Sequence, residues 1–576
     1  MMRRIIRRRL ADGAAAALLP GNLHPLLRRI YAARGIRSGA ELQLSLDQLI
    51  PVRQLGGVEP AVELLCDHYR RGSRIVVVGD FDADGATSTA LVVRQLRRLG
   101  FPAVDFLVPN RFQYGYGLTP EIVRLAAERK PALIVTVDNG MSSLAGVEEA
   151  RRLGIQTLIT DHHLPGPVTP QADVIVNPNA PGEAFPSKAL AGVGVAFYVM
   201  AALTRTVQER GLTSAKAPVA ELLDLVALGT VADLVPLDRN NRILVHEGLR
   251  RIRAGRCVAG VRALLEASNR ALSEVVANDL GFQVGPRLNA AGRLDDMTIG
   301  IQCLLTDDLA TARMLAARLT QLNQDRKELE LQMQQEAMAA IGDMRAEDPA
   351  LPLGLCLYDE SWHQGVVGLV ASRVKEKVHR PVIALARADA RMLKGSARSV
   401  HGVHIRDVLE AIATRYPGVI EKFGGHAMAA GLSVPLERLE EFRAAFDAEV
   451  QRWMSRDDAV GIIYSDGELR GDELTLDVAR LLREAGPWGQ AFPEPVFDGI
   501  FQVRGVRVLG DRHLKLEVCH EDVPGCDALA FRHFDDASAP LVQPNDRVEL
   551  AYRLDVNRFN GTERVQLLVE YLRVVS

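Results

Sequence analysis

Residues 76–85, VVVGDFDADG, join an apolar run to three aspartates at alternate positions, Asp80, Asp82 and Asp84. Alternate side chains of a strand face the same side, so we expect these carboxylates to point together at the C-terminal end of a strand. Gly85 permits a sharp turn into the helix that follows. Three like charges on one edge repel strongly unless a cation lies between them. A solvated acidic loop is the alternative interpretation of this stretch alone.

Further polar residues follow other apolar runs. Asp138 follows Leu133–Val137, Asp161-His162-His163 follows Thr157–Thr160, and Asp233 follows the helical run that begins at Val226. In open α/β sheets, ligands gather beyond the carboxyl ends of the strands, so we expect these side chains to converge. Carboxylates mixed with imidazole, without thiolate, suit Mn²⁺ or Mg²⁺ better than structural zinc. The surplus of carboxylates suggests two ions, which together activate water and neutralise charge on a phosphoryl oxygen.

The hydrophobic pattern predicts a multidomain α/β protein. From about 70 to 235 apolar runs alternate with amphipathic helical patterns, which indicates parallel βαβ units, and a second α/β region runs from about 351 to 455. Residues 306–346 form a one-sided apolar stripe, which predicts one long helix between two lobes, capped at Thr306. From about 462 short alternating strands predict a small β-barrel. The expected units are a helical lead-in (1–50), an α/β domain with a parallel sheet (51–305), the connecting helix (306–346), a smaller α/β domain (347–458) and the barrel (459–576).

Composition places few limits on function. The 576 residues carry a formal net charge of −3, which excludes only general polycation behaviour, because nucleic acids are bound by local basic grooves. Six cysteines without C-x-x-C spacing indicate neither a zinc ribbon nor a disulfide framework. No apolar run reaches about twenty residues. We therefore expect a soluble, cytoplasmic protein without a membrane partner.

The ordered motifs around the aspartates resemble those of the DHH phosphoesterase superfamily. The resemblance implies that the cations are held by Asp82, Asp84, Asp138, His162 and Asp233. It also implies that His163 faces the scissile phosphate, with Asp161 orienting an imidazole. Some relatives have a metal-binding histidine where this sequence has Val78, and we expect Asp80 to compensate as a ligand.

Later segments resemble the branch of this superfamily that degrades single-stranded DNA. The segments are Gly281–Arg293, Gly395–Ser399, Phe423–Ala427 and Pro487–Pro495. The resemblance makes the smaller α/β domain a DHHA1 substrate-binding domain and the barrel an oligonucleotide-binding OB-fold. Arg287, Ser396 and Arg398 supply guanidinium groups and a hydroxyl that suit a terminal 5′-phosphate, and His426 lies in one of the paired motifs. A surface ion pair is the alternative for each arginine.

A loop of the first domain combines arginine with aromatic residues. Arg111, Phe112 and Tyr114 stand among glycines, and this mixture suits phosphate contact with base stacking. Packing of either ring in the core is equally compatible with the sequence.

The resemblance implies a nuclease that removes mononucleotides from single-stranded DNA in the 5′→3′ direction, using two Mn²⁺ or Mg²⁺ ions. It further implies roles in recombination and DNA repair, a helicase and a single-strand-binding protein as partners, and a monomeric state. Two alternatives stay open: a hydrolase of short oligonucleotides or cyclic dinucleotides, and a non-catalytic DNA-binding scaffold. The barrel counts against the first, and the filled ligand positions count against the second.

Overall fold

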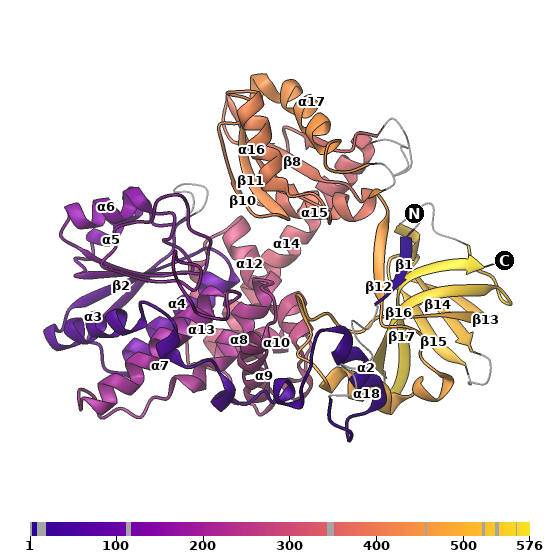
Figure 1. Ribbon diagram of the computed structural model, residues 1–576, viewed down its shortest axis with the longest axis horizontal. Coiled ribbons are helices and arrows are strands. Elements are labelled where there is room, and N and C mark those ends of the chain that lie inside the picture. Colours follow the sequence, from indigo (N-terminus) through magenta and orange to yellow (C-terminus); the bar gives the residue numbers. More distant parts are fainter. Residues whose placement is uncertain are drawn as a thin grey trace.

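The computed structural model describes residues 3–8, 19–110, 117–341, 351–455, 458–520, 525–535, 541–559 and 561–575. They form three bodies: a first α/β domain, a smaller α/β domain reached through helix α14, and a β-barrel (Figure 1). None of the helices in these ranges combines the length and apolar composition that a membrane crossing requires.

The first domain is built on a five-stranded parallel sheet with the order β3-β2-β4-β5-β6. Its strands are β2 (Arg74–Gly79), β3 (Ala103–Leu107), β4 (Leu133–Val137), β5 (Gln156–Thr160) and β6 (Val174–Val176). Side chains of β2 alternate between two cores. Ile75 and Val77 pack with the helices over residues 58–71, 83–98 and 192–209, whereas Val76 and Val78 pack with the helices over residues 120–127 and 144–152. The doubly covered parallel sheet predicted from the sequence is confirmed.

Helices surround this sheet and extend the domain on one side. They are α3 (Val58–Arg71), α4 (Ala83–Arg98), α5 (Pro120–Ala127), α6 (Leu144–Arg152), α7 (Gly192–Glu209), α8 (Leu223–Ala232), α9 (Arg239–Arg253), α10 (Ala259–Glu266), α11 (Ala277–Asp279), α12 (Gly285–Leu294) and α13 (Thr298–Leu305). A π-helical turn, Leu280–Val284, joins α11 to α12.

Helix α14 (Leu309–Ile341) connects the two α/β domains. At about 1.5 Å per residue it is roughly 50 Å long, as predicted. Its apolar stripe is divided between two cores. Leu319 and Leu322 belong to the core of the first domain, whereas Met333 belongs to a core shared with helix α15 (Val367–Val378) of the smaller domain. The cap differs from the prediction: Asp308, not Thr306, accepts the hydrogen bond from the Thr311 amide. Asp308 directly precedes the first helical residue, where a side chain can reach the free amides.

The smaller α/β domain has a five-stranded mixed sheet with the order β10-β11-β9-β8-β7. Its elements are β7 (Leu355–Tyr358), α15 (Val367–Val378), β8 (Val382–Arg387), β9 (Met392–Arg398), α16 (Ile405–Arg415), β10 (Lys422–Gly425), β11 (Ala429–Pro435) and α17 (Leu439–Val450). Helices α16 and α17 cover one face of the sheet. On the other face, helix α15 covers β7 and β8 and its first turn reaches Ser396 and Arg398 of β9, so β11, β10 and the Lys394 end of β9 stay open on this side.

The last body is a closed barrel with the order β13-β14-β15-β17-β16. Its strands are β13 (Phe497–Leu509), β14 (His513–Cys519), β15 (Cys526–Ala530), β16 (Arg547–Phe559) and β17 (Thr562–Val575), and α18 (Leu476–Glu484) packs beside it. The predicted small barrel is confirmed.

The predicted helical lead-in is wrong for its first residues. Residues 25–33 do form a helix, α2 (Pro25–Ala33), but Arg3–Arg7 form strand β1. This strand pairs in parallel with β12 (Gly461–Ser465), close to the barrel (Figure 1). Arg7 also donates two hydrogen bonds to Asp498 of the barrel. The partner strand lies over 450 residues away in the sequence, so no local pattern could indicate it.

Candidate metal centre and substrate pocket

The aspartates of residues 76–85 are held by the turn from β2 into α4. Asp82 caps the helix by accepting from the Gly85 amide at 3.0 Å. Asp84, in the first turn, accepts from the amides of Gly192 and Val193 at the start of α7. A Cβ on Gly85 would lie 2.5 Å from the Asp80 carbonyl oxygen, so only glycine fits this turn. Strand β2 ends at Gly79, so the turn into α4, and not alternation along a strand, places the carboxylates at the end of the sheet.

His162 lies among carboxylates from other elements. Its Nε2 is 3.1 Å from Asp138 Oδ1, 3.5 Å from Asp233 Oδ2 and 4.0 Å from Asp84 Oδ2. Burial, followed by the nearby charge of His163, lowers the pKa of His162 to about 4, so its ring is neutral at pH 7. A neutral ring directs a lone pair, rather than a proton, at these carboxylates when Nδ1 carries the hydrogen.

The carboxylates repel one another. Burial and the charge of Asp82 raise the pKa of Asp84 to about 7. Burial and the neighbouring carboxylates raise the pKa values of Asp138 and Asp233 well above the ordinary range. Three overlapping sets of ligand atoms each lie within 4.8 Å of one another: Asp138, His162 and His163; Asp84, His162 and Asp233; and Asp80, Asp82 and Asp138. These carboxylate oxygens and imidazole nitrogens are crowded together with little positive charge among them. Such a set of donor atoms suits divalent cations.

Asp161 holds the second histidine of the triplet. Its Oδ1 is 2.7 Å from His163 Nδ1 and accepts from the amides of His162 and His163. Its Oδ2 accepts from the Met141 amide. Burial alone would lower the pKa of His163, but the bond to Asp161 and nearby carboxylates raise it to about 9. The His163 ring is therefore fixed in orientation and protonated near pH 7.

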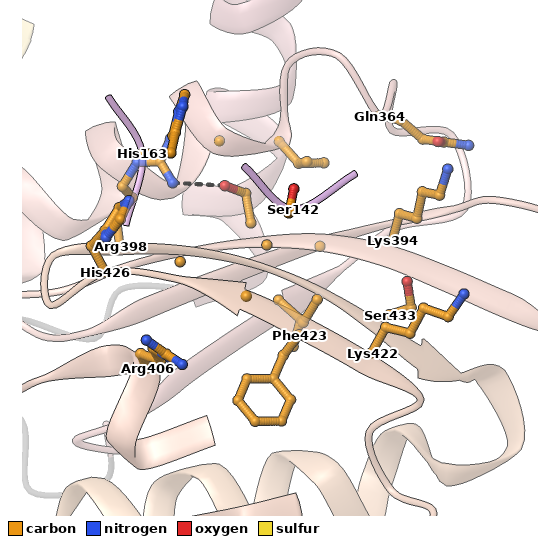
Figure 2. Close-up of a pocket in the computed structure, with 18 of the residues that line it drawn as sticks. Ser142, His163, Gln364, Lys394, Arg398, Arg406, Lys422, Phe423, His426 and Ser433 are labelled. Atoms are coloured by element: carbon orange, nitrogen blue, oxygen red, sulfur yellow. Dashed lines mark hydrogen bonds between the residues drawn. The ribbon is translucent and has the colours of Figure 1, made fainter. Parts of the chain in front are cut away.

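A cavity of about 1060 Å³ lies between the two α/β domains beside these residues. Asp82 and His163 line it from the first domain, and Ser396, Arg398 and His426 line it from the second. Arg398 donates to Ser396 Oγ at 2.7 Å, and Figure 2 shows Arg398 at the same end of the cavity as His163 and His426. The structure therefore places five of the predicted site residues on this cavity, beside the cluster of carboxylates around His162.

Arg287 does not join them. It is largely buried, and its guanidinium donates to the Thr320 hydroxyl and to the carbonyl of Gln283, which ties α12 to α14 and to the π-helical turn. Arg287 is not one of the described residues that line the cavity. Arg111, Phe112 and Tyr114 lie outside the described residues, so the structure does not place them.

Family models match the three bodies in order. The DHH family N-terminal domain matches residues 74–230, the DHHA1 domain matches 353–452, and the RecJ OB domain matches 465–571. Over 96% of this chain, a protein from Dickeya dadantii named single-stranded-DNA-specific exonuclease RecJ is 56% identical, with 97% of its own length covered. The chain belongs to the RecJ family.

Other RecJ proteins support the same assignment. The protein of that name from Escherichia coli is 53% identical, with 98% of both chains covered. A crystal structure of RecJ in complex with Mn²⁺ from Thermus thermophilus superposes with a TM-score of 0.81 at 31% identity. It covers 99% of this chain, and this chain covers 79% of it. The RecJ fold thus extends over all three bodies described above.

The RecJ pocket also contains residues that the sequence did not single out. Lys394 of β9, Lys422 of β10 and Ser433 of β11 line the cavity at the end away from His163 (Figure 2). Lys394 and Lys422 stand two residues before Ser396 and Gly424, so strand alternation could have indicated that they share a face with the predicted motifs. Their pairing across β11 depends on register, which the sequence alone does not show.

Proposed function

We propose that this chain is a single-strand-specific DNA exonuclease that removes mononucleotides in the 5′→3′ direction with two Mn²⁺ or Mg²⁺ ions. One observation carries the proposal. The buried Nε2 of His162 lies within 4.0 Å of three carboxylates, and the neighbouring Asp82 and His163 line a cavity that also contains Arg398. A cation-binding centre beside an anion-binding pocket suits hydrolysis of a phosphodiester near a terminal phosphate.

Asp80, Asp82, Asp84, Asp138, His162 and Asp233 are the proposed ligands. When bound, the cations supply an activated water and neutralise charge on the phosphoryl oxygens. The chain's own contribution is orientation. His163, protonated and held by Asp161, donates a hydrogen bond to a phosphoryl oxygen and stabilises the charge that develops there.

Ser396, Arg398 and His426 are the proposed 5′-phosphate contacts. Arg398 is largely enclosed, and its guanidinium makes hydrogen bonds to Ser396 and to the Ala397 carbonyl that fix its position. The first turn of α15, with Val367 and Gly368, borders the same space. A guanidinium, a hydroxyl and a helix N-terminus together favour a terminal phosphate. Binding the end of a strand beside the metal centre makes cleavage exonucleolytic.

The other features are extensions of this proposal. The relatives' printed name supports single-stranded DNA as the substrate. Work in recombination and repair, a helicase and a single-strand-binding protein as partners, a monomeric state and a cytoplasmic location are predictions from the family resemblance. Contacts of Arg287, Arg111, Phe112 and Tyr114 with DNA also stay predictions.

A directional digestion tests the proposal. A single strand labelled at its 5′ end is expected to release labelled mononucleotide at once in the presence of Mn²⁺, whereas a 3′-labelled strand is expected to shorten progressively. An equal rate on blunt duplex, or immediate release of a 3′ label, would contradict the proposal. Chelation of the metal is expected to stop both reactions.

A further inference from the structure

The open face of the smaller domain's sheet carries side chains in rows that cross three strands. One row contains Lys422, Ser433 and Lys394, which are direct neighbours on β10, β11 and β9. The next row contains Gly424, Gly431 and Ser396. Arg398 and His426 stand beyond it, both next to Ala429. Adjacent rows are about 7 Å apart along the strands.

The middle row is a glycine floor. Neither Gly424 nor Gly431 has a positive φ, and a Cβ on either would meet no atom within 4 Å. Backbone conformation and packing therefore do not require glycine at these positions. Glycine does leave the backbone open to close approach by a ligand in the cavity.

The first row is a basic end of the cavity. Neither Lys394 nor Lys422 forms an ion pair within the part of the chain that the structure describes. Figure 2 shows Lys394 and Lys422, with Ser433 and Gln364, at the opposite end of the cavity from His163. Arg406 and Glu410 of α16 also line the cavity, and their opposite charges offset each other. Two lysines facing a hydroxyl across one strand suit a phosphoryl group.

We propose that Lys394, Ser433 and Lys422 bind phosphoryl groups attached beyond the 5′-terminal phosphate, so that the enzyme accepts strands with a 5′-triphosphate. This inference rests on the proposed function, because it takes the terminal phosphate to lie at Ser396 and Arg398. The glycine floor then lies under the β-phosphoryl group, and the basic row meets the γ-phosphoryl group. The row has no aromatic ring, and although Phe423 lines part of the cavity, it packs against the core on the other face, so a polyphosphate fits better than a further nucleoside.

The reaction on such a strand is an ordinary hydrolysis. Water adds to the phosphorus between the first and second nucleotides, and the bond from that phosphorus to the 3′ oxygen of the first nucleotide breaks. The first nucleotide leaves as a nucleoside 5′-triphosphate with a 3′-hydroxyl. The shortened strand keeps a 5′-monophosphate, and no other reactant is needed.

Binding without catalysis gives the first test. Short single strands with a 3′ fluorophore and either a 5′-triphosphate or a 5′-monophosphate are titrated with the full chain in EDTA, with anisotropy as the readout. The triphosphate strand is expected to bind roughly tenfold more tightly, in line with charge-assisted contacts. Lys394→Met and Lys422→Met are each expected to remove most of this ratio. Lys377→Met, near the C-terminal end of α15 and outside the cavity lining, is the matched control and should keep this ratio.

Product analysis separates the possible outcomes. With Mn²⁺, the wild-type chain is expected to release nucleoside triphosphate from the triphosphate strand. The inference is overturned if the triphosphate strand binds no more tightly than the monophosphate strand. It is also overturned if a variant with both Lys394→Met and Lys422→Met keeps the wild-type ratio of the two affinities. Dinucleotide release that the lysine variants abolish would show that the row holds a phosphodiester instead. A binding preference without any cleavage would contradict the proposed function but leave the anion site standing.

Discussion

Asp138 combines an unusual backbone with a central place among the carboxylates. Its φ of 61° is left-handed, and a Cβ on Gly192 would lie 2.6 Å from its own Cβ. Asparagine tolerates this backbone region and has nearly the same size. Exchange of the carboxylate for an amide therefore changes charge with little change in shape.

We predict that Asp138→Asn lowers the exonuclease rate roughly 100-fold or more, beyond the effect typical of outer-shell partners. Calorimetric titration with Mn²⁺ is expected to show weakened binding, and the rise in melting temperature that Mn²⁺ gives the wild-type chain should shrink. Asp105→Asn is the control, because Asp105 of β3 forms an exposed ion pair with Arg74 of β2. If Asp138→Asn kept full activity, the assignment of Asp138 as a metal ligand would be wrong.

Asp161 is a positioning residue, because it contacts His163 and backbone amides. We predict that Asp161→Asn lowers kcat about 10–100-fold with little change in KM for a 5′-phosphorylated strand. A double-mutant cycle with His163→Gln checks the route of the effect. If Asp161 acts through His163, the double variant should be no slower than His163→Gln alone; additive losses would contradict this role.

At the residue scale, local sequence indicated much of the pocket and missed what depends on distant partners. The motifs at the ends of β2, β4 and β5 could be predicted, because parallel strands bring their carboxyl ends to one edge. Arg287 shows the limit. Its hydrogen-bond partner Thr320 lies on α14, so the guanidinium is held away from the cavity by a contact that no local motif encodes.

At the scale of elements, α14 and α15 are joined by a cluster of charged side chains. Glu330 is largely buried and lies 3.0 Å from Arg326 of its own helix and 3.0 Å from Arg373 of α15. Since α15 borders the cavity, this cluster links the connecting helix to the substrate pocket.

We predict that Glu330→Gln destabilises the chain by about 2–4 kcal/mol, because it leaves the buried Arg326 without its counter-charge. Urea unfolding measures the change, and Glu328→Gln on the exposed face of α14 is the control. KM for single-stranded DNA is also expected to rise, since α15 would lose a contact that positions it. If Glu330→Gln had the same free energy of unfolding as Glu328→Gln, the charged cluster would contribute nothing to stability.

Elements were predicted well where their partners are close in sequence. The strands of the first domain's sheet and the long helix followed from hydrophobic period, whereas β9, β10 and β11 of the smaller domain were not predicted as strands. The cap of α14 moved by two residues, because both Thr306 and Asp308 are good capping side chains. Strand β1 could not be predicted, because Arg3–Arg7 contain only two apolar residues and their partner strand begins at Gly461.

At the scale of the whole molecule, the pocket lies between two separately built domains. Its volume of about 1060 Å³ is that of a small-ligand site and suits a terminal nucleotide. We predict that a strand with a 5′ single-stranded tail and a 3′ hairpin is digested until the junction approaches the pocket and then arrests. Denaturing electrophoresis should show a short protected tail of constant length. Digestion through the hairpin at an undiminished rate would contradict this geometry.

The pairing of β1 with β12 has a consequence for how the chain is made. Translation completes β1 long before Gly461–Ser465 emerge, and both α/β domains can fold in the interval. During that time Ile5 and Ile6 and the open edge of β1 stay unpaired, which exposes the nascent chain to wrong strand partners. The arginines of β1 supply charge that discourages such pairing until Asp498 of the barrel is available. Slowing of translation just before residue 461 would therefore lengthen the period in which the chain is prone to aggregate.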